Sequence, residues 1–183
     1  MKSRKLAVLA ACAVVALTSG CGAAGGDPQA HEASRTALHA SRVKDYNTFA
    51  ELKQDSVAVV KVTATGSAER SLSSVPTTVT TVAVDDVLWG NSPAQSLSIQ
   101  QLGRSNMDLE DTGAILEKGQ QYILFVEPFH MTPGDDTGLY QITGGQGVYR
   151  LNKAGSDYMF AGGGKPKLPK QFVASAAGDV AKN

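Results

Sequence analysis

The densest run of β-branched side chains in this 183-residue chain is Thr77-Thr78-Val79-Thr80-Thr81-Val82-Ala83-Val84-Asp85-Asp86-Val87-Leu88-Trp89-Gly90. Side chains that branch at Cβ favour the extended backbone, and they pack well on the pleated surface of a sheet. The stretch therefore predicts a β-strand that ends at Trp89-Gly90.

Further strand patterns lie on both sides of this stretch. Residues 57–63 are apolar or β-branched on both faces, which is typical of a central strand. Residues 96–100 alternate between apolar and polar side chains, as in a strand with one face in water. The predicted strands are residues 57–63, 77–88, 96–100, 121–126, 139–143, 148–151 and 157–160. Residues 66–76, rich in serine, are expected to form an exposed loop.

Two short helices are predicted to frame these strands. Tyr46, Phe49 and Leu52 recur at helical spacing, and residues 172–180 repeat that spacing near the C-terminus. Six to seven short strands with peripheral helices predict an all-β domain, either a small OB-like barrel or a sandwich. Trp89 is expected to plug the barrel.

Three phrases of the sequence occur in an order found in one known family. They are Asp55 to Val60, Val82 to Gly90 and Lys118 to Phe125. Over residues 55–126 they resemble the netrin-like and tissue-inhibitor-of-metalloproteinase domains, which implies an OB-type barrel. In the inhibitors of that family an N-terminal cysteine chelates the zinc of the target protease. Here Cys21 lies far from the predicted barrel and the family's disulfides are absent, so the resemblance implies the fold but not protease inhibition.

The N-terminus has the three regions of a bacterial export signal. Three basic residues precede twelve apolar ones, residues 6–17, and Leu17-Thr18-Ser19-Gly20-Cys21 completes the signal. Twelve residues are too few for a bilayer span, which takes about 20. Residues 17–21 resemble the lipobox of bacterial lipoprotein precursors, with Thr18 in place of the usual leucine. That resemblance implies cleavage before Cys21 and a diacylglyceryl group on its sulfur, and two fatty-acid chains such as palmitate hold a protein on a membrane for long times.

Three segments follow from these patterns. Residues 1–20 are predicted to be the lipoprotein signal peptide, residues 21–43 the lipidated cysteine with a flexible tether, and residues 44–183 a single extracytoplasmic β domain. The only cysteines are Cys12, in the signal, and Cys21. The domain therefore has no disulfide or thiolate site and depends on its own core, and a domain of this size buries about two-thirds of its unfolded surface.

The charge of the processed chain argues against a nucleic-acid partner. Removing residues 1–20 takes three of the 17 basic residues and none of the 17 acidic ones, which leaves a net charge of −3. Nucleic-acid binding depends on the neutralisation of phosphates by lysine and arginine. We expect no nucleic-acid partner.

One polar constellation could hold a metal ion. Glu127, His130, Asp135 and Asp136 fall within ten residues, and imidazole with carboxylates suits zinc or a harder cation. The alternative is a solvated histidine beside the turn residues Pro-Gly-Asp-Asp. This alternative is favoured because the other two histidines lie in the tether, so we expect no metal and no other cofactor.

The sequence thus predicts a lipid-anchored protein on the extracytoplasmic face of the cell membrane that binds a ligand rather than transforming one. Its expected partners are the membrane, through Cys21, and an envelope protein or glycan, but no ligand-binding residue can be named. One alternative is a metal-assisted hydrolase centred on His130. Another is a purely structural envelope protein. A serine hydrolase is disfavoured because the chain lacks a Gly-x-Ser-x-Gly motif.

Overall fold

The computed structural model describes residues 36, 38, 44–91, 94–110, 112–165 and 167–180. These residues belong to one compact unit that begins at residue 35. The predicted signal peptide and Cys21 lie outside the described residues. No helix within the described ranges is long and apolar enough to cross a membrane.

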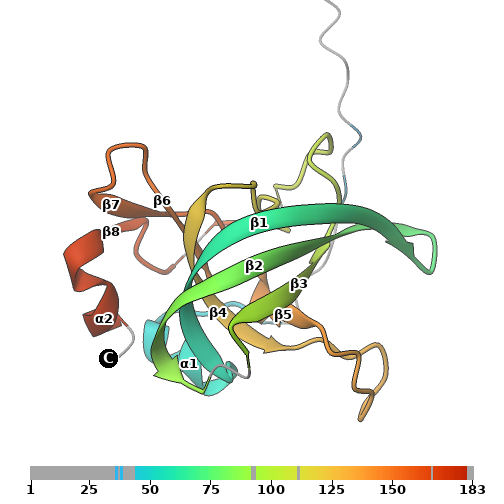
Figure 1. The fold of residues 1–183 in the computed structure, drawn as a ribbon, viewed down its shortest axis with the longest axis horizontal. Coiled ribbons are helices and arrows are strands. Elements are labelled where there is room, and N and C mark those ends of the chain that lie inside the picture. The colour runs from blue at the N-terminus through green and yellow to red at the C-terminus, as the bar shows by residue number, and fades with distance from the viewer. Residues whose placement is uncertain are drawn as a thin grey trace, which may run out of the picture. The chain divides into compact units, whose positions relative to one another are not determined.

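Eight strands dominate the secondary structure of the described chain, so the all-β prediction is confirmed (Figure 1). The strands are β1 (Ala58–Leu72), β2 (Val75–Gly90), β3 (Ser96–Leu102), β4 (Gln121–Pro128), β5 (Tyr140–Ile142), β6 (Val148–Leu151), β7 (Asp157–Phe160) and β8 (Gln171–Val173). The helical elements are α1 (Phe49–Gln54), α2 (Ala177–Val180) and the 3-10 turns η1 (Thr143–Gly145) and η2 (Ala174–Ala176).

Five of the strands close into a barrel. β1 pairs with both β2 and β4, β2 pairs with β3, and β5 joins β3 to β4. All of these pairings are antiparallel except the one between β3 and β5. A closed barrel of five strands is the OB-like form of the predicted fold. β6, β7 and β8 extend the sheet outward from β4.

The barrel interior is an apolar core supplied by alternate residues of each strand. Val82 of β2 and Leu124 of β4 are both completely buried in it. Residues 58, 60, 62 and 64 of β1, Leu97 and Ile99 of β3 and Ile142 of β5 belong to the same cluster, together with Leu116 and Val148. The period-2 pattern of the sequence therefore directs one face of every barrel strand inward.

A second core lies outside the barrel, against the other face of β4. Tyr122 and Leu124 of β4 face the barrel interior, whereas Phe125 belongs to the second core and is fully buried in it. The rings of Phe49 and Phe125 stack with centroids 5.7 Å apart, and α1 with β6, β7 and β8 supplies the rest of the cover. The aromatic residues of the second half of the chain are thus used mainly for packing.

Helix α1 lies within residues 44–55, where the sequence predicts a helix, but it begins only at Phe49. The hydroxyl of Thr48 accepts a hydrogen bond from the Glu51 backbone N–H at 3.2 Å, and Glu51 Oε2 accepts from the Asn47 N–H at 2.8 Å. The Thr48 hydroxyl thus satisfies one of the backbone donors that the first turn of a helix leaves free, and the Glu51 carboxylate holds the residue before the N-cap. Leu52 then anchors the helix in the second core.

Three local predictions are wrong. Residues 66–76 are not a loop: β1 and β2 continue as a hairpin beyond the barrel and turn at Ser73 and Ser74, both with positive φ (Figure 1). Trp89 does not plug the barrel; it is 37% exposed, with Lys53 Nζ 5.8 Å from its ring. Residues 172 and 173 lie in β8 rather than in a helix, because their backbone pairs with β7.

Two residues of the segment predicted to be a tether contact the domain. The Asp108 N–H donates to the Thr36 carbonyl at 3.0 Å, and the Leu38 N–H donates to the Asp108 carbonyl at 3.1 Å. These bonds attach the segment to the loop that follows β3.

Candidate functional site

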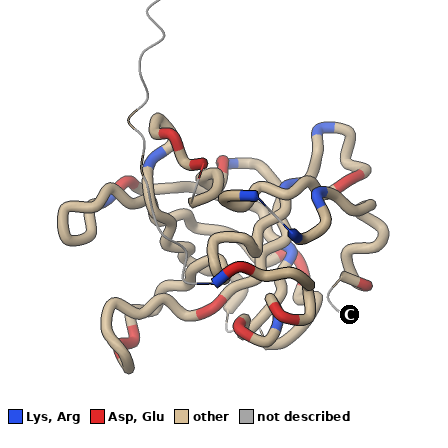
Figure 2. Tube along the Cα trace, turned by 180° about the vertical axis from the view of Figure 1, so that it is seen from behind, with Lys and Arg blue, Asp and Glu red and all other residues tan. Residues whose placement is uncertain are grey.

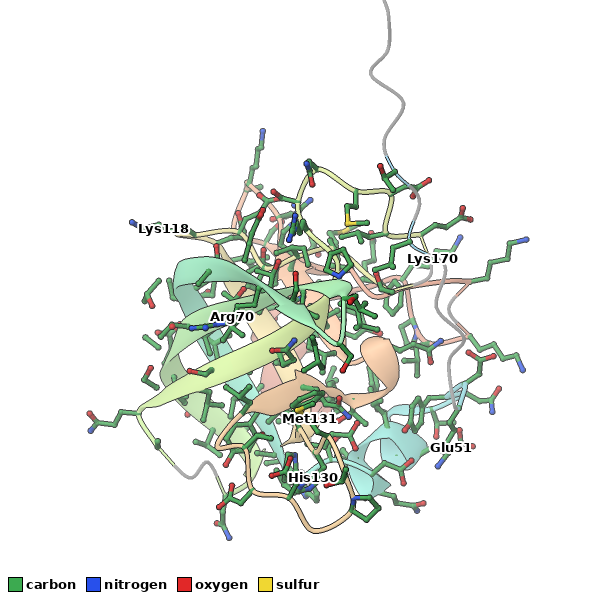
Figure 3. All side chains as sticks on the ribbon, turned by 90° about the vertical axis from the view of Figure 1, so that its right-hand side faces the viewer. Glu51, Arg70, Lys118, His130, Met131 and Lys170 are labelled. Carbon is green, nitrogen blue, oxygen red and sulfur yellow. The ribbon has the colours of Figure 1, made fainter. Side chains whose placement is uncertain are left out.

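The predicted metal ligands lie at the end of β4 and in the loop that follows it. Glu127 belongs to β4, and its Oε1 accepts a hydrogen bond from Gln141 Nε2 of β5 at 3.1 Å. His130 Nδ1 lies against the Asp135 carbonyl, and Figure 3 shows His130 and Met131 on this exposed loop. Asp136 Oδ1 accepts from the Gly138 N–H at 3.1 Å. These polar groups therefore interact mainly with their own loop.

The four residues do not assemble into a metal site. Within the described ranges, no group of three or more histidine, cysteine, aspartate or glutamate side chains is placed to hold a metal ion. Asp135 accepts from the Met131 N–H at 3.4 Å, the geometry of a turn that caps its own backbone.

Glu127 is nevertheless electrostatically unusual. Burial raises the pKa of its carboxyl above the ordinary value, and the negative charge of Asp55 adds to the effect. The hydrogen bond from Gln141, the backbone N–H of Gly144 and the nearby His130 oppose the rise. A desolvated carboxyl of this kind favours its neutral form.

The chain before α1 is hydrogen-bonded to Gln146, the residue that directly follows η1. The Tyr46 N–H donates to Gln146 Oε1 at 3.0 Å, and Gln146 Nε2 donates to Asp45 Oδ1 at 3.1 Å. Burial, followed by the hydrogen bond to Asp55, raises the pKa of the Tyr46 hydroxyl. Gln146 is 1% exposed, so its amide satisfies buried backbone and side-chain groups and has a structural role.

The remaining candidate is the side of the barrel formed by outward-facing residues of β1, β2, β3 and β5, called the outer face below. Inward residues such as Val82 alternate with outward ones, so the register assigns each outward side chain its neighbours. Across the strands the outward register partners are Arg70–Thr77–Leu102, Ala68–Val79–Gln100 and Gly66–Thr81–Ser98. None of these residues is aromatic, so the outer face has no ring platform in this region.

The set of partners that contains Gln100 continues toward β4 through the side-chain amides of Gln100 and Gln141, called the amide row below. Gln100 of β3 pairs in register with Gln141 of β5, and Gln141 pairs with Glu127. Gln100 is 9% exposed, and no hydrogen bond joins its side-chain amide to another described residue. Gln141 uses Nε2 for Glu127 and keeps Oε1 as an acceptor. The row thus carries hydrogen-bonding capacity that the fold does not use.

Thr77 is the most unusual residue of the outer face. It is 1% exposed, and its Oγ1 has no hydrogen-bond partner among the described residues. Buried hydroxyls without a partner are uncommon because the lost hydration is not replaced. Its register neighbours Arg70 and Leu102 are both exposed, Leu102 by 42%.

The Arg70 side chain forms no ion pair with another described residue. The adjacent Glu69 belongs to the opposite face of the hairpin and lies 3.4 Å from Arg104 Nε. In Figure 3, Arg70 extends to the left of the hairpin, away from His130 and Met131. Among the described residues, Arg70 is therefore a cation without an ion-pair partner on the outer face.

Charges of both signs are interspersed along the trace as seen from behind (Figure 2).

The sequence analysis assigned no binding role to any outer-face residue. Arg70 falls in the stretch expected to be a loop, and an irregularity between Ala64 and Gly66 shifts the register of the hairpin. Only the observed pairing places Arg70 beside Thr77. The length of the β-branched run in β2 could have indicated the hairpin, because a long strand needs a partner strand of similar length.

No protein-family model matches this chain, and no curated protein matches its sequence.

Proposed function

We propose that the protein is a lipid-anchored binding domain on the extracytoplasmic face of a cell membrane, and that its ligand, part of an envelope protein or glycan, binds the outer face. The anchor is proposed from residues 17–21, whose small residues before Cys21 resemble a lipobox. The binding role rests on one observation, the unused polar groups of Thr77 and Gln100, which are buried among the exposed residues Arg70, Thr81 and Leu102 of the outer face.

The position of these groups supports binding. In OB barrels the corresponding face of the second and third strands, flanked by the loops between strands 1 and 2 and strands 4 and 5, holds extended ligands. Here the β1–β2 hairpin and the loop after β4 occupy the corresponding places in the chain order. The outer face combines hydroxyl and amide groups with aliphatic side chains, a combination suited to recognition through hydrogen bonds and apolar contact.

Cell fractionation tests the anchor. Cys21→Ser should release the protein into the soluble fraction or leave an unprocessed precursor, because the proposed anchor depends on the cysteine sulfur. A variant that stays in membranes and still incorporates labelled palmitate would exclude lipidation at Cys21.

Photo-crosslinking in intact cells tests the binding face. A photoreactive amino acid at Thr81, exposed on the outer face, should capture an envelope component. The matched control is Ala154, exposed in the turn between β6 and β7. Equal capture from both positions, or none from Thr81, would contradict ligand binding at the outer face.

A further inference from the structure

We propose that the outer face binds the C-terminal end of an extended peptide whose last side chain is aliphatic. This inference rests on the proposed binding function and names its ligand class. Arg70 and Thr77 would hold the terminal carboxylate, Leu102 and Val75 the last side chain, and the amide row the preceding peptide group.

The carboxylate position is defined by two donors that the fold leaves unused. Arg70 and Thr77 are register partners on neighbouring strands, so their side chains leave the same face with Cβ atoms about 5 Å apart. Arg70 offers a planar fork of N–H donors that fits a carboxylate, and the Thr77 hydroxyl can add a third donor. A carboxylate here would supply the partner that Thr77 Oγ1 lacks.

The apolar position lies directly beside these donors. Leu102 is the register partner of Thr77 on β3, and Val75 is two residues before Thr77 on the same face of β2. They are 42% and 38% exposed, so both leave aliphatic surface in water. A ligand that covers them gains apolar burial next to its charged end.

The amide row favours a peptide over a fatty acid. Gln100 lies two residues from Leu102 along β3, which is about 7 Å. In an extended peptide the amide group two residues before the terminal carboxylate lies about 7 Å from it. Gln100 and Gln141 Oε1 can therefore donate to and accept from a peptide bond, whereas a fatty acid has no group for them.

The side chains that flank Thr77 on the neighbouring strands are long and movable. Arg70 and Leu102 are its cross-strand neighbours, and both are exposed on the outer face. Long side chains at exposed positions change rotamer within nanoseconds. In the proposed complex these side chains move aside to admit the carboxylate to the Thr77 hydroxyl, which is 1% exposed in the free protein.

Fluorescence anisotropy with the full-length protein in detergent tests the inference. The probe is fluorescein-labelled Gly-Ala-Val-Leu with a free carboxylate, compared with the same peptide ending in a carboxamide, and octanoate serves as a competitor. The free acid should bind at least about tenfold more tightly than the amide, the size of a charge-assisted hydrogen-bond contribution. Octanoate should compete weakly because it lacks peptide groups.

Two variants and one control separate a ligand contact from a structural effect. Arg70→Gln should bring the acid-to-amide ratio close to one. Thr77→Val removes the hydroxyl but keeps the shape of the side chain. It should lower the affinity for the free-acid peptide by about three- to tenfold without lowering the melting temperature. Lys118→Gln, an exposed cation in the turn before β4 (Figure 3), should leave the ratio unchanged.

The possible failures are distinguishable. If neither peptide binds, if acid and amide bind equally to the wild type, or if Arg70→Gln retains the preference, the inference is wrong. Those results do not contradict the proposed function, because the ligand could still be a glycan or another protein surface. Crosslinking from Thr81 tests that function independently. Absence of specific crosslinking would overturn the binding function itself.

Discussion

The Tyr46 hydroxyl donates a 2.8 Å hydrogen bond to Asp55 Oδ2, the same oxygen that accepts from Lys44 Nζ at 2.6 Å. Tyr46 and Asp55 lie on opposite sides of α1 in the sequence, so this contact closes the segment that contains the helix. The bond from Lys44, followed by that from Tyr46, lowers the pKa of Asp55 below its ordinary value.

This relationship predicts a loss of stability in acid. The folded-state pKa of Asp55 is depressed, so its contribution is fully present above the unfolded pKa near 4 and is lost as pH falls through the folded value. Asp55→Asn should therefore lower the melting temperature at pH 6 and flatten its dependence on pH below about 4. Asp86→Asn, an exposed residue of β2, is the control. An unchanged acid slope in Asp55→Asn would contradict the assignment.

The pKa of Glu127 is shifted in the opposite direction to that of Asp55. Burial raises its folded-state pKa, so its contribution to stability is present below the unfolded pKa near 4.3 and is lost as pH rises through the folded value. Glu127→Gln, which keeps an acceptor for Gln141, should therefore raise the melting temperature at pH 7. The difference from wild type should disappear in acid, and a variant that is less stable at pH 7 would show that the charge is needed.

Gly144 is predicted to be intolerant of alanine because of Tyr46. Its φ is +57°, and an added Cβ would lie 2.4 Å from Tyr46 Cε2. Gly134 has a φ of +84° and no atom within 4 Å of such a Cβ. Gly134→Ala should cost about 1–2 kcal/mol through backbone strain, and Gly144→Ala should cost about 1–3 kcal/mol more through overpacking. Equal losses in urea unfolding would show that the Tyr46 contact is unimportant.

Charge in the barrel interior should prevent folding. Val82 and Leu124 are completely buried, so Val82→Asp or Leu124→Asp would each place an unpaired carboxylate in the core at a cost of several kcal/mol. Thr81→Asp, one position away but exposed, should change stability by only about 0.5 kcal/mol. Near-UV circular dichroism provides the readout. A folded Val82→Asp would mean that this face of β2 is not in the core.

Metal analysis tests the hydrolase alternative centred on His130. The exposed imidazole and its loop partners predict that the dialysed protein contains no stoichiometric zinc or calcium. His130→Ala should leave stability within about 0.5 kcal/mol, as expected for a surface side chain. Retained metal that is lost in this variant would support a site formed with Glu127, Asp135 and Asp136.

The sequence predicted the barrel strands well because each has a strong local pattern. The β1–β2 hairpin was missed because Gly66, Pro76 and several serines suggest a loop, and the turn residues Ser73 and Ser74 lack the usual Asn-Gly signal. Their pairing is instead imposed by the β-branched residues of β2. Trp89 was misplaced because periodicity does not show where the barrel ends.

The candidate site was less predictable than the fold. Arg70, Thr77 and Leu102 come from three strands, and only the register brings them together. The four residues singled out from the sequence are close along the chain, but proximity in sequence did not make them a ligand set. Long-range pairing, which no local pattern encodes, decides where the unused donors lie.

The closed ring of strands also implies an order of events during folding. The β1–β2 hairpin joins neighbouring segments, whereas Ala58 must find Val126 to close the barrel. Such distant contacts form late because the entropy of closing a long loop is lost before they can stabilise the chain. A chain synthesised only as far as β3 therefore has an unpaired edge on β1, and this edge invites association with other chains until β4 covers it.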